Sequence, residues 1–125
     1  VGESKKLEGI RVRLSSGIDG TVQYKTYTEN DGWETWSEDG EINGKSDGTR
    51  RLEAIQIRLT GEAAEKYDIY YRVHCQDDGW LGWAKNGAPA GTAGYAKRLE
   101  GIEIRLVPKG QAAPGSTARS YISAY

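Results

Sequence analysis

Hydrophobic residues alternate with polar ones in short runs along this chain, and the runs recur. The clearest run, residues 55–59 (IQIRL), returns at 102–106 (IEIRL) and is matched near the start by 10–14 (IRVRL). Side chains at every second position of a β-strand lie on one face of the sheet. Each run therefore predicts a strand with its Ile, Val and Leu side chains facing a core and its charged side chains facing outward.

A second kind of alternating run precedes two of these strands, at residues 22–28 and 69–75. Period-2 alternation assigns a core face and a polar face to each. The core faces hold Val22, Tyr24, Thr26 and Thr28 in the first copy, and Ile69, Tyr71, Val73 and Cys75 in the second. The tripeptides 30–32 (NDG) and 77–79 (DDG) that follow are typical of chain-reversing turns.

An internal repeat organises the whole chain. A shift of 47 places superposes residues 22–59 on 69–106, with fourteen of the 38 positions identical. A partial copy at 4–14 precedes them, so we assign residues 1–107 to one tandem-repeat domain. Residues 108–118 (PKGQAAPGSTA) predict a flexible linker, and 119–125 a further strand resembling the start of another unit. The chain is thus expected to be a segment of a longer protein.

These patterns predict an all-β fold. Antiparallel sheets built from repeats of about 47 residues should pack as a pseudosymmetric β-sandwich or a β-prism-like domain, because sheets with one apolar face must cover one another. The sequence does not distinguish the two arrangements. Residues 61–66 (GEAAEK) predict one helical turn at most.

Composition narrows the function classes. The 125 residues carry a net charge of −1, which provides no general attraction for nucleic acid or an anionic membrane. No run is long and apolar enough to predict membrane insertion. One cysteine and one histidine cannot form a disulfide framework or an ordinary zinc site, so we expect no metal and no cofactor.

A catalytic role is not expected. His74 and Cys75 are adjacent in the sequence, but neighbouring side chains of a strand point to opposite faces, so the imidazole cannot easily activate the thiol. Cys75 is predicted to be a buried structural residue. We therefore expect a protein that is not an enzyme.

Three glutamates recur before the closing strand, at Glu8, Glu53 and Glu100. Each side chain starts on the core side, where a carboxylate needs polar partners. Turn amides, a Trp or Tyr side chain, or an arginine such as Arg51 or Arg98 could supply them. We expect a structural clamp, with ligand contact as the alternative.

The candidate ligand residues centre on the tryptophans. Indole faces stack on sugar rings and anchor protein interfaces, whereas a chain with no Phe and no Met also needs Trp in its core. Three-residue spacing on a strand predicts opposite faces, so one Trp of each pair should be buried and the other partly exposed. The candidates are Trp33, Trp36, Trp80 and Trp83, with Lys25, Tyr27, Arg72 and His74 on the polar faces and Asp31 and Asp78 in the turns.

The spacings resemble the ChW repeat, the clostridial hydrophobic repeat with a conserved Trp. The second repeat carries its features in order: an aromatic strand, GWxxW at 79–83, Gly87, a Gly turn at 91–94 and RLEGIxIxL at 98–106. The first repeat carries GWxxW at 32–36, Gly40, Gly44 and LEAIxIxL at 52–59. No catalytic residue is associated with this motif.

The resemblance implies an extracellular, secreted or cell-wall-associated module of a Gram-positive bacterium. We expect a noncatalytic binding or adhesion module whose partner is a glycan or a host or cell-surface protein, immunoglobulin included. A passive structural spacer that supports a neighbouring domain is the alternative from a different class. The sequence predicts neither the ligand nor the oligomeric state.

Overall fold

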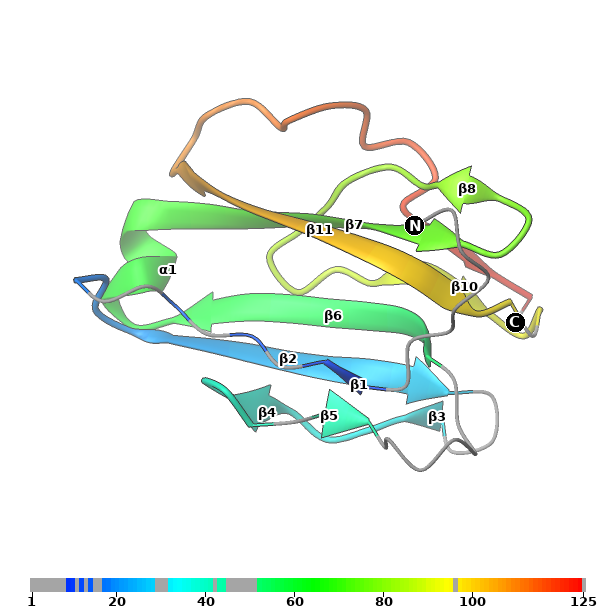
Figure 1. The fold of residues 1–125 in the computed structure, drawn as a ribbon. Helices are drawn as coiled ribbons and strands as arrows, with labels where there is room; N and C mark the ends of the chain where they lie inside the picture. The colour runs from blue at the N-terminus through cyan, green and yellow to red at the C-terminus, as the bar shows by residue number, and fades with distance from the viewer. Residues whose placement is uncertain are drawn as a thin grey trace.

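Two pairs of long antiparallel strands form the body of the molecule (Figure 1). Each pair is called a hairpin, although shorter strands lie between its two members in the sequence. The computed structural model describes residues 9–10, 12, 14, 17–28, 32–41, 43–44, 52–95 and 97–124. The first hairpin pairs β2 (Thr21–Thr28) with β6 (Leu52–Thr60), and the second pairs β7 (Tyr67–Cys75) with β11 (Leu99–Pro108). The all-β, antiparallel, tandem-repeat fold predicted from the sequence is confirmed.

Short strands flank the hairpins in the same way in each repeat. β3 and β4 pair with β2, and β8 and β9 pair with β7. The short elements are β1 (Gly9–Ile10), β3 (Gly32–Trp33), β4 (Ser37–Glu38), β5 (Asn43–Gly44), α1 (Glu62–Lys66), β8 (Gly79–Trp80), β9 (Ala84–Lys85), β10 (Ala90–Ala93) and β12 (Tyr121–Ser123). The short helix α1 connects β6 to β7. Within the described residues no helix has the length and apolar character needed to span a bilayer.

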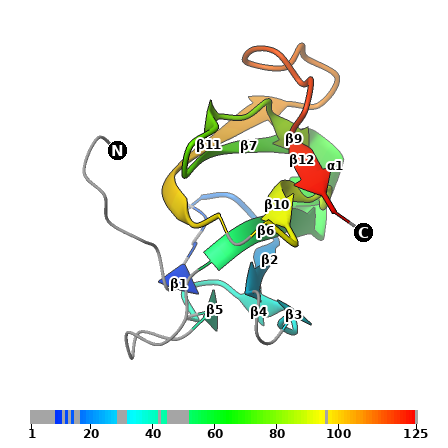
Figure 2. The same ribbon diagram turned by 90° about the vertical axis from the view of Figure 1, so that its right-hand side faces the viewer.

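The core lies between the two hairpins, which form two layers (Figures 1 and 2). The predicted core faces of β2, β6 and β7 are buried as expected, and Val12 and Leu14 pack against them from the N-terminal copy. The layers do not close into a complete sandwich. The buried cluster includes Val22, Tyr24, Leu52, Ile55, Ile57, Leu59, Ile69, Tyr71, Val73, Cys75 and Leu99.

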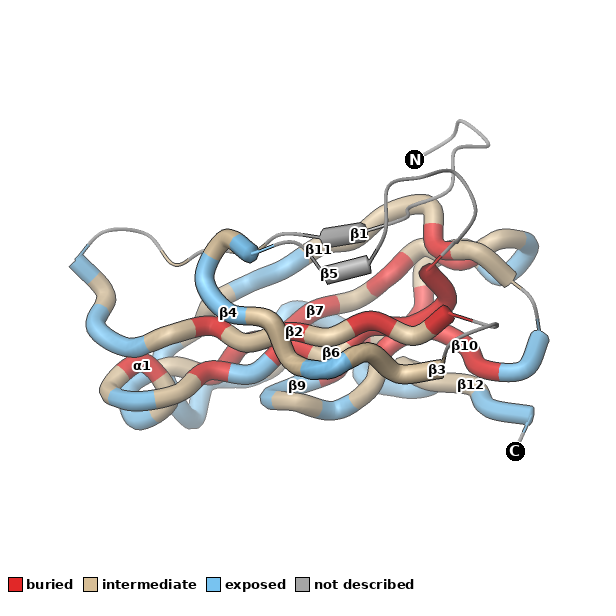
Figure 3. Tube along the Cα trace, turned by 90° about the horizontal axis from the view of Figure 1, so that it is seen from below, coloured by how far each residue is buried: buried red, intermediate tan, exposed pale blue. Residues whose placement is uncertain are grey.

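The third strand of the second repeat departs from the prediction. Ile104 is 40% exposed, whereas its counterpart Ile57 in β6 is fully buried. Ile102 and Leu106 are only partly buried, and Figure 3 shows most of β11 in tan and pale blue. β6 is paired with a strand along each of its edges, while β11 pairs only with β7 among the described strands. Fewer neighbouring side chains therefore cover β11.

Each repeat is braced by equivalent hydrogen bonds from a buried tyrosine and from a turn residue with positive φ. The tyrosine hydroxyl donates to a loop carbonyl, and the turn side chain accepts from the first strand. The pairs are Tyr24 Oη to Glu41 O, Tyr71 Oη to Ala88 O, Val22 N to Asp39 Oδ1 and Ile69 N to Asn86 Oδ1. Because the same bonds occur in both copies, the repeat seen in the sequence is also a repeat in the three-dimensional structure.

The repeats are joined by strand pairing across the boundary between them. β10 of the second repeat adds to the edge of β6 in the first, and β5 of the first repeat pairs in the same antiparallel sense with β1 of the N-terminal copy. Each repeat therefore docks on the third strand of the copy before it.

The C-terminal segment folds back over the second repeat. Residues 109–120 contain no regular strand, and β12 then adds to β10 in parallel, with Gly91 opposite Tyr121. The strand predicted at 119–125 therefore pairs with β10 of the second repeat, at Tyr121–Ser123.

A buried carboxylate ties this segment to the second hairpin. Asp68 Oδ1 accepts a bond of 2.9 Å from Asn86 Nδ2, and Oδ2 accepts one of 3.1 Å from the Gly110 N–H. Lys109 Nζ lies 3.3 Å from Oδ1 and Lys85 Nζ 3.7 Å from Oδ2. These bonds, the one from Asn86 above all, lower the pKa of Asp68 to about 2.

Replacing Asp68 by asparagine should lower the free energy of unfolding at pH 7 by about 2 kcal/mol, as expected for loss of hydrogen bonds to a charged group. Because the folded pKa lies below the unfolded one, the carboxylate stabilises the fold above the unfolded value of 3.8 and loses this effect as the pH falls toward 2. Urea titrations from pH 7 to pH 2 measure both. The variant should lose less stability than the wild type between pH 4 and 2. Exposed Asp77 provides the control in Asp77→Asn, and equal acid profiles for Asp68→Asn and wild type would contradict the assignment.

Candidate functional site

Both tryptophans of the first repeat lie on the same side of the sheet. Lys25 Nζ is 5.5 Å from the ring centroid of Trp33 and 4.8 Å from that of Trp36. The prediction that they face opposite sides is wrong. The strand β3 ends at Trp33 and residues 34–36 are not in a strand, so period-2 alternation does not extend to Trp36.

The second repeat reproduces this arrangement with an arginine. Arg72 Cζ lies 4.7 Å from the centroid of Trp80 and 5.0 Å from that of Trp83, within the range of cation–π attraction. Trp83 is 5% exposed and Trp80 is half-buried. One buried and one partly exposed Trp is the predicted outcome for this pair, but both tryptophans of the first repeat are half-buried.

The aromatic residue two positions after each cation completes the cluster. Tyr27 packs on Trp33 with ring centroids 5.4 Å apart, and His74 meets Trp80 edge-on at 5.3 Å. Lys25, Tyr27, Arg72 and His74 therefore lie beside the tryptophans on the polar faces of β2 and β7. The structure brings eight of the ten candidate ligand residues into these two clusters.

An arginine covers part of the Trp cluster of the first repeat. Arg58 Cζ lies 3.8 Å from the centroid of Trp36, the shortest cation–ring distance among the described residues. Its Nε donates to Gln23 Oε1 at 2.7 Å, and Gln23 Nε2 donates to Glu38 Oε1 at 2.6 Å. One face of Trp36 is thus occupied by a hydrogen-bonded guanidinium.

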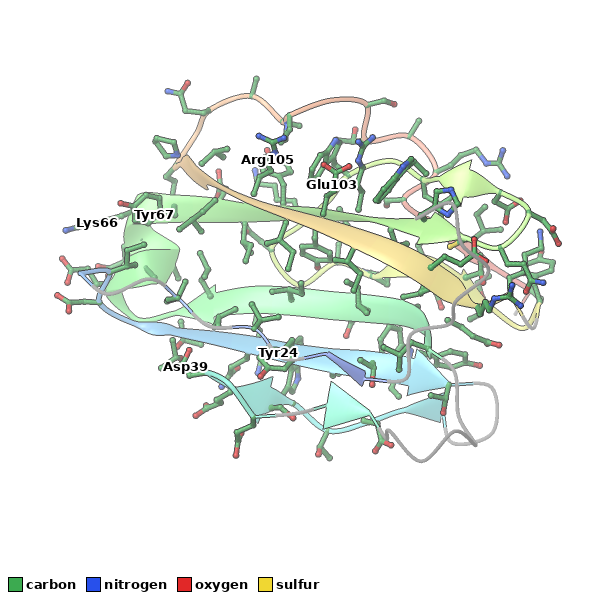
Figure 4. All side chains as sticks on the ribbon, viewed as in Figure 1. Tyr24, Asp39, Lys66, Tyr67, Glu103 and Arg105 are labelled. Atoms are coloured by element: carbon green, nitrogen blue, oxygen red, sulfur yellow. The ribbon has the colours of Figure 1, made fainter. Side chains whose placement is uncertain are left out.

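The cluster of the second repeat opens into a pocket of about 580 Å³. The hairpin side contributes aromatic and charged side chains, and the C-terminal segment contributes the opposite wall. Figure 4 shows Glu103 and Arg105 on the side of β11 that faces this segment. The lining residues used below are Arg72, Trp80, Trp83, Glu103, Arg105 and Ser116.

The two arginines of the pocket, Arg72 and Arg105, differ in their ion pairing. Arg72 binds Glu103, with Nη2 at 2.5 Å and Nε at 3.0 Å from the same carboxylate oxygen, Oε1. Arg105 is exposed and makes no ion pair with any of the described residues. The pocket therefore holds one ion pair in a fixed position and one guanidinium available to an anion.

A glycine allows the C-terminal wall to approach. A Cβ at Gly82 would lie 2.1 Å from the carbonyl oxygen of Ala118, so any side chain there would displace the segment. The backbone N–H of Trp83 donates to Ser116 O at 2.8 Å. The first repeat has Thr35 at the position of Gly82, so its Trp cluster could not receive a segment in the same way.

The two turn aspartates contribute less. Asp31 lies outside the described residues. Asp78 is exposed, pairs with Lys97 Nζ at 3.0 Å, and borders a separate pocket of about 200 Å³ that shares Trp80. The structure places Asp78 outside the larger pocket.

The clamp glutamates differ between repeats. Glu8 and Arg51 lie outside the described residues, and Glu53 is fully buried. Glu100 lies between Arg98 and His74: its Oε2 is 3.2 Å from Arg98 Nη2 and its Oε1 is 3.3 Å from His74 Nδ1. Arg98 is one of the partners considered from the sequence.

His74 and Cys75 are separated as their strand positions predict. Cys75 is fully buried, and burial raises the pKa of its thiol to about 12, so the thiol remains protonated. The His74 ring contacts Trp80 on the opposite side of the strand. In the part of the chain that the structure describes, no three His, Cys, Asp or Glu residues gather as a metal site.

Sequence reasoning missed half of the pocket. Glu103 and Arg105 were assigned only to an outward face, and residues 114–118 to a linker. Contacts across the tertiary fold have no short-range signal. The residues between the paired tryptophans, Glu34-Thr35 in the first repeat and Leu81-Gly82 in the second, indicate in the sequence that the repeats differ here.

The architecture defines an all-β tandem-repeat protein whose repeats each carry a tryptophan–cation cluster. The family model for clostridial hydrophobic W (ChW) repeats matches residues 27–61 and 74–108, one match for each repeat. The chain belongs to the ChW repeat family. Searches of curated proteins and of solved structures gave no match.

Proposed function

We propose that this chain is a noncatalytic glycan-binding module and that the pocket of the second repeat is its binding site. The proposal extends to a place outside the cell, on a secreted or cell-wall protein, as the family resemblance implies. Its main support is the combination, in one pocket, of an indole, a fixed ion pair and an arginine that forms no ion pair with the described residues.

Each group suits one part of a sugar. The half-buried Trp80 presents an apolar ring to the apolar side of a pyranose. Arg72 and Glu103 hold each other in place, so their remaining donors and acceptors are preorganised for vicinal hydroxyls. The volume of about 580 Å³ falls within the range of small-ligand sites.

The unpaired guanidinium selects among glycans. Arg105 can accept a carboxylate or sulfate in bidentate geometry, an interaction that a neutral sugar cannot make. We therefore propose that the preferred ligands are acidic oligosaccharides, which contain uronic acids or sulfate groups. A passive spacer would have no use for a charged pocket closed by a segment distant in sequence.

Trp80→Ala should weaken acidic-oligosaccharide binding about thirtyfold, the effect of losing an anchor worth about 2 kcal/mol. Arg105→Ala should weaken it at least tenfold and remove most of the preference for acidic over neutral oligosaccharides. Isothermal titration calorimetry with oligogalacturonate, a heparin-derived oligosaccharide and neutral cello-oligosaccharide measures both effects.

The first repeat supplies matched controls. Trp33→Ala and Arg58→Ala make the same chemical changes at the equivalent positions of the first-repeat cluster, and they should leave binding within twofold. Circular dichroism checks that each variant is folded. Absence of saturable binding to all three oligosaccharides, or an equal loss in the first-repeat variants, would reject the pocket as a glycan site.

A further inference from the structure

The boundary between the two repeats is a template for how one repeat docks on another. Along the edge of β6, Ala90 lies opposite Ile55 and Gly91 opposite Ala54. Before β10 in the chain, the backbone N–H of Gly87 donates to Ile57 O at 2.7 Å. The second repeat thus binds the third strand of the first repeat, β6, through backbone hydrogen bonds.

The N-terminal copy makes the same contacts with the first repeat. Asn43 lies opposite Ile10 and Gly44 opposite Gly9, and the Gly40 N–H donates to Val12 O at 2.8 Å. These are the repeat equivalents of the contacts at β6. The docking geometry therefore occurs twice in one chain.

Among the described strands, a third copy of the docking strand has no such partner. β11 pairs with β7 along one edge, and along the other edge none of the described strands pairs with it. Ile104, the counterpart of Val12 and Ile57, is 40% exposed. β12 lies against β10, on the opposite side of the second repeat (Figure 2). An apolar strand with one unpaired edge invites pairing with another chain.

The sequence of β11 matches the strand that the first repeat already binds. Residues 99–106 (LEGIEIRL) and 7–14 (LEGIRVRL) share six of eight residues. The first repeat of a second copy would therefore meet on β11 nearly the same sequence that its own N-terminal copy presents.

We propose that β11 docks a second copy of this chain, whose first repeat binds it in place of that copy's residues 7–14. The template sets the register: Ile102 opposite Asn43 and Gly101 opposite Gly44 of the second copy, with Ile104 O accepting from its Gly40 N–H. Such a head-to-tail contact is heterologous, so it extends into longer assemblies unless it closes into a ring. The proposal does not rest on glycan binding, although β11 also supplies Glu103 and Arg105 to the pocket.

Disulfide trapping tests this register in the full chain. The background is Cys75→Thr, the residue found at position 28 of the first repeat. Mixing a chain carrying Ile102→Cys with one carrying Asn43→Cys should give a disulfide-linked heterodimer as the main product, because directly opposed antiparallel residues lie within disulfide range.

Glu103→Cys mixed with Asn43→Cys is the matched control, because its side chain lies on the opposite face, and it should give at least tenfold less cross-link. In sedimentation experiments on the natural chain, self-association should be concentration-dependent and at least tenfold weaker in Ile104→Lys. Absence of the 102–43 cross-link, or equal cross-linking at 103, overturns the proposal even if Ile104→Lys fails to fold.

Discussion

Replacing Gly91 by alanine is expected to lower the free energy of unfolding by about 2–5 kcal/mol. Gly91 has a φ of +123°, and a Cβ there would lie 2.3 Å from Glu53 O and 2.7 Å from Ala54 Cα. Both contacts are with the backbone of β6, which cannot give way without breaking the pairing between the repeats. Backbone strain of about 1–2 kcal/mol and overpacking of about 1–3 kcal/mol act together.

Gly79→Ala is the control for this prediction. Its φ is +72°, and a Cβ would meet open space. The change should therefore cost only the backbone strain, about 1–2 kcal/mol. Urea unfolding followed by Trp fluorescence gives both values. A cost for Gly91→Ala no larger than that for Gly79→Ala would show that β10 does not approach β6 closely.

Removing the Tyr71 side chain is expected to have a comparable effect. Tyr71 is fully buried between the two layers, and truncating a buried aromatic residue to alanine costs about 3–5 kcal/mol. Burial raises the pKa of its hydroxyl to about 12, so the hydroxyl remains a donor to Ala88 O at any ordinary pH.

Tyr71→Phe separates the ring from the hydroxyl. It keeps the ring and leaves Ala88 O without this donor, which should cost about 1–2 kcal/mol. Thermal unfolding by circular dichroism, with wild type and both variants at the same pH, ranks the three proteins. Equal stability of Tyr71→Ala and Tyr71→Phe would mean that the ring is not part of the core.

The strand faces could be predicted from the sequence because they depend on local alternation alone. Tyr24, Ile57 and Val73 are buried where the period of two assigned them, and Arg58 and Arg72 lie on the polar faces. The repeat then transferred each assignment from one copy to the other. Burial of one strand face against a neighbouring sheet is the main constraint on which residues are apolar. It produces an alternation that is visible in consecutive residues.

The remaining features depend on partners far away in the chain. Trp36 and Trp83 lie on the same side as Trp33 and Trp80 because the chain leaves the strand after two residues, which the alternation does not record. Ile104 occupies a position that the alternation assigns to the core, and it is exposed because no described strand pairs with the second edge of β11. Both differences arise where a strand ends or lacks a neighbour.

The two repeats share a scaffold and differ in the residues that surround their tryptophans. Leu81 and Gly82 replace Glu34 and Thr35, and these small or apolar residues allow the C-terminal segment to close one side of the second Trp cluster. In the first repeat Arg58 covers Trp36. The two repeats thus carry equivalent Trp clusters, and in the second one the described residues line a pocket.

The central claim is that ligand binds at the Trp cluster of the second repeat. The most direct test follows the four indole N–H signals by NMR, assigned through single Trp→Phe variants, during titration with oligogalacturonate. The signals of Trp80 and Trp83 should shift with saturation while those of Trp33 and Trp36 stay in place. Movement confined to Trp33 and Trp36, or four unmoved signals at every ligand concentration, would contradict the account.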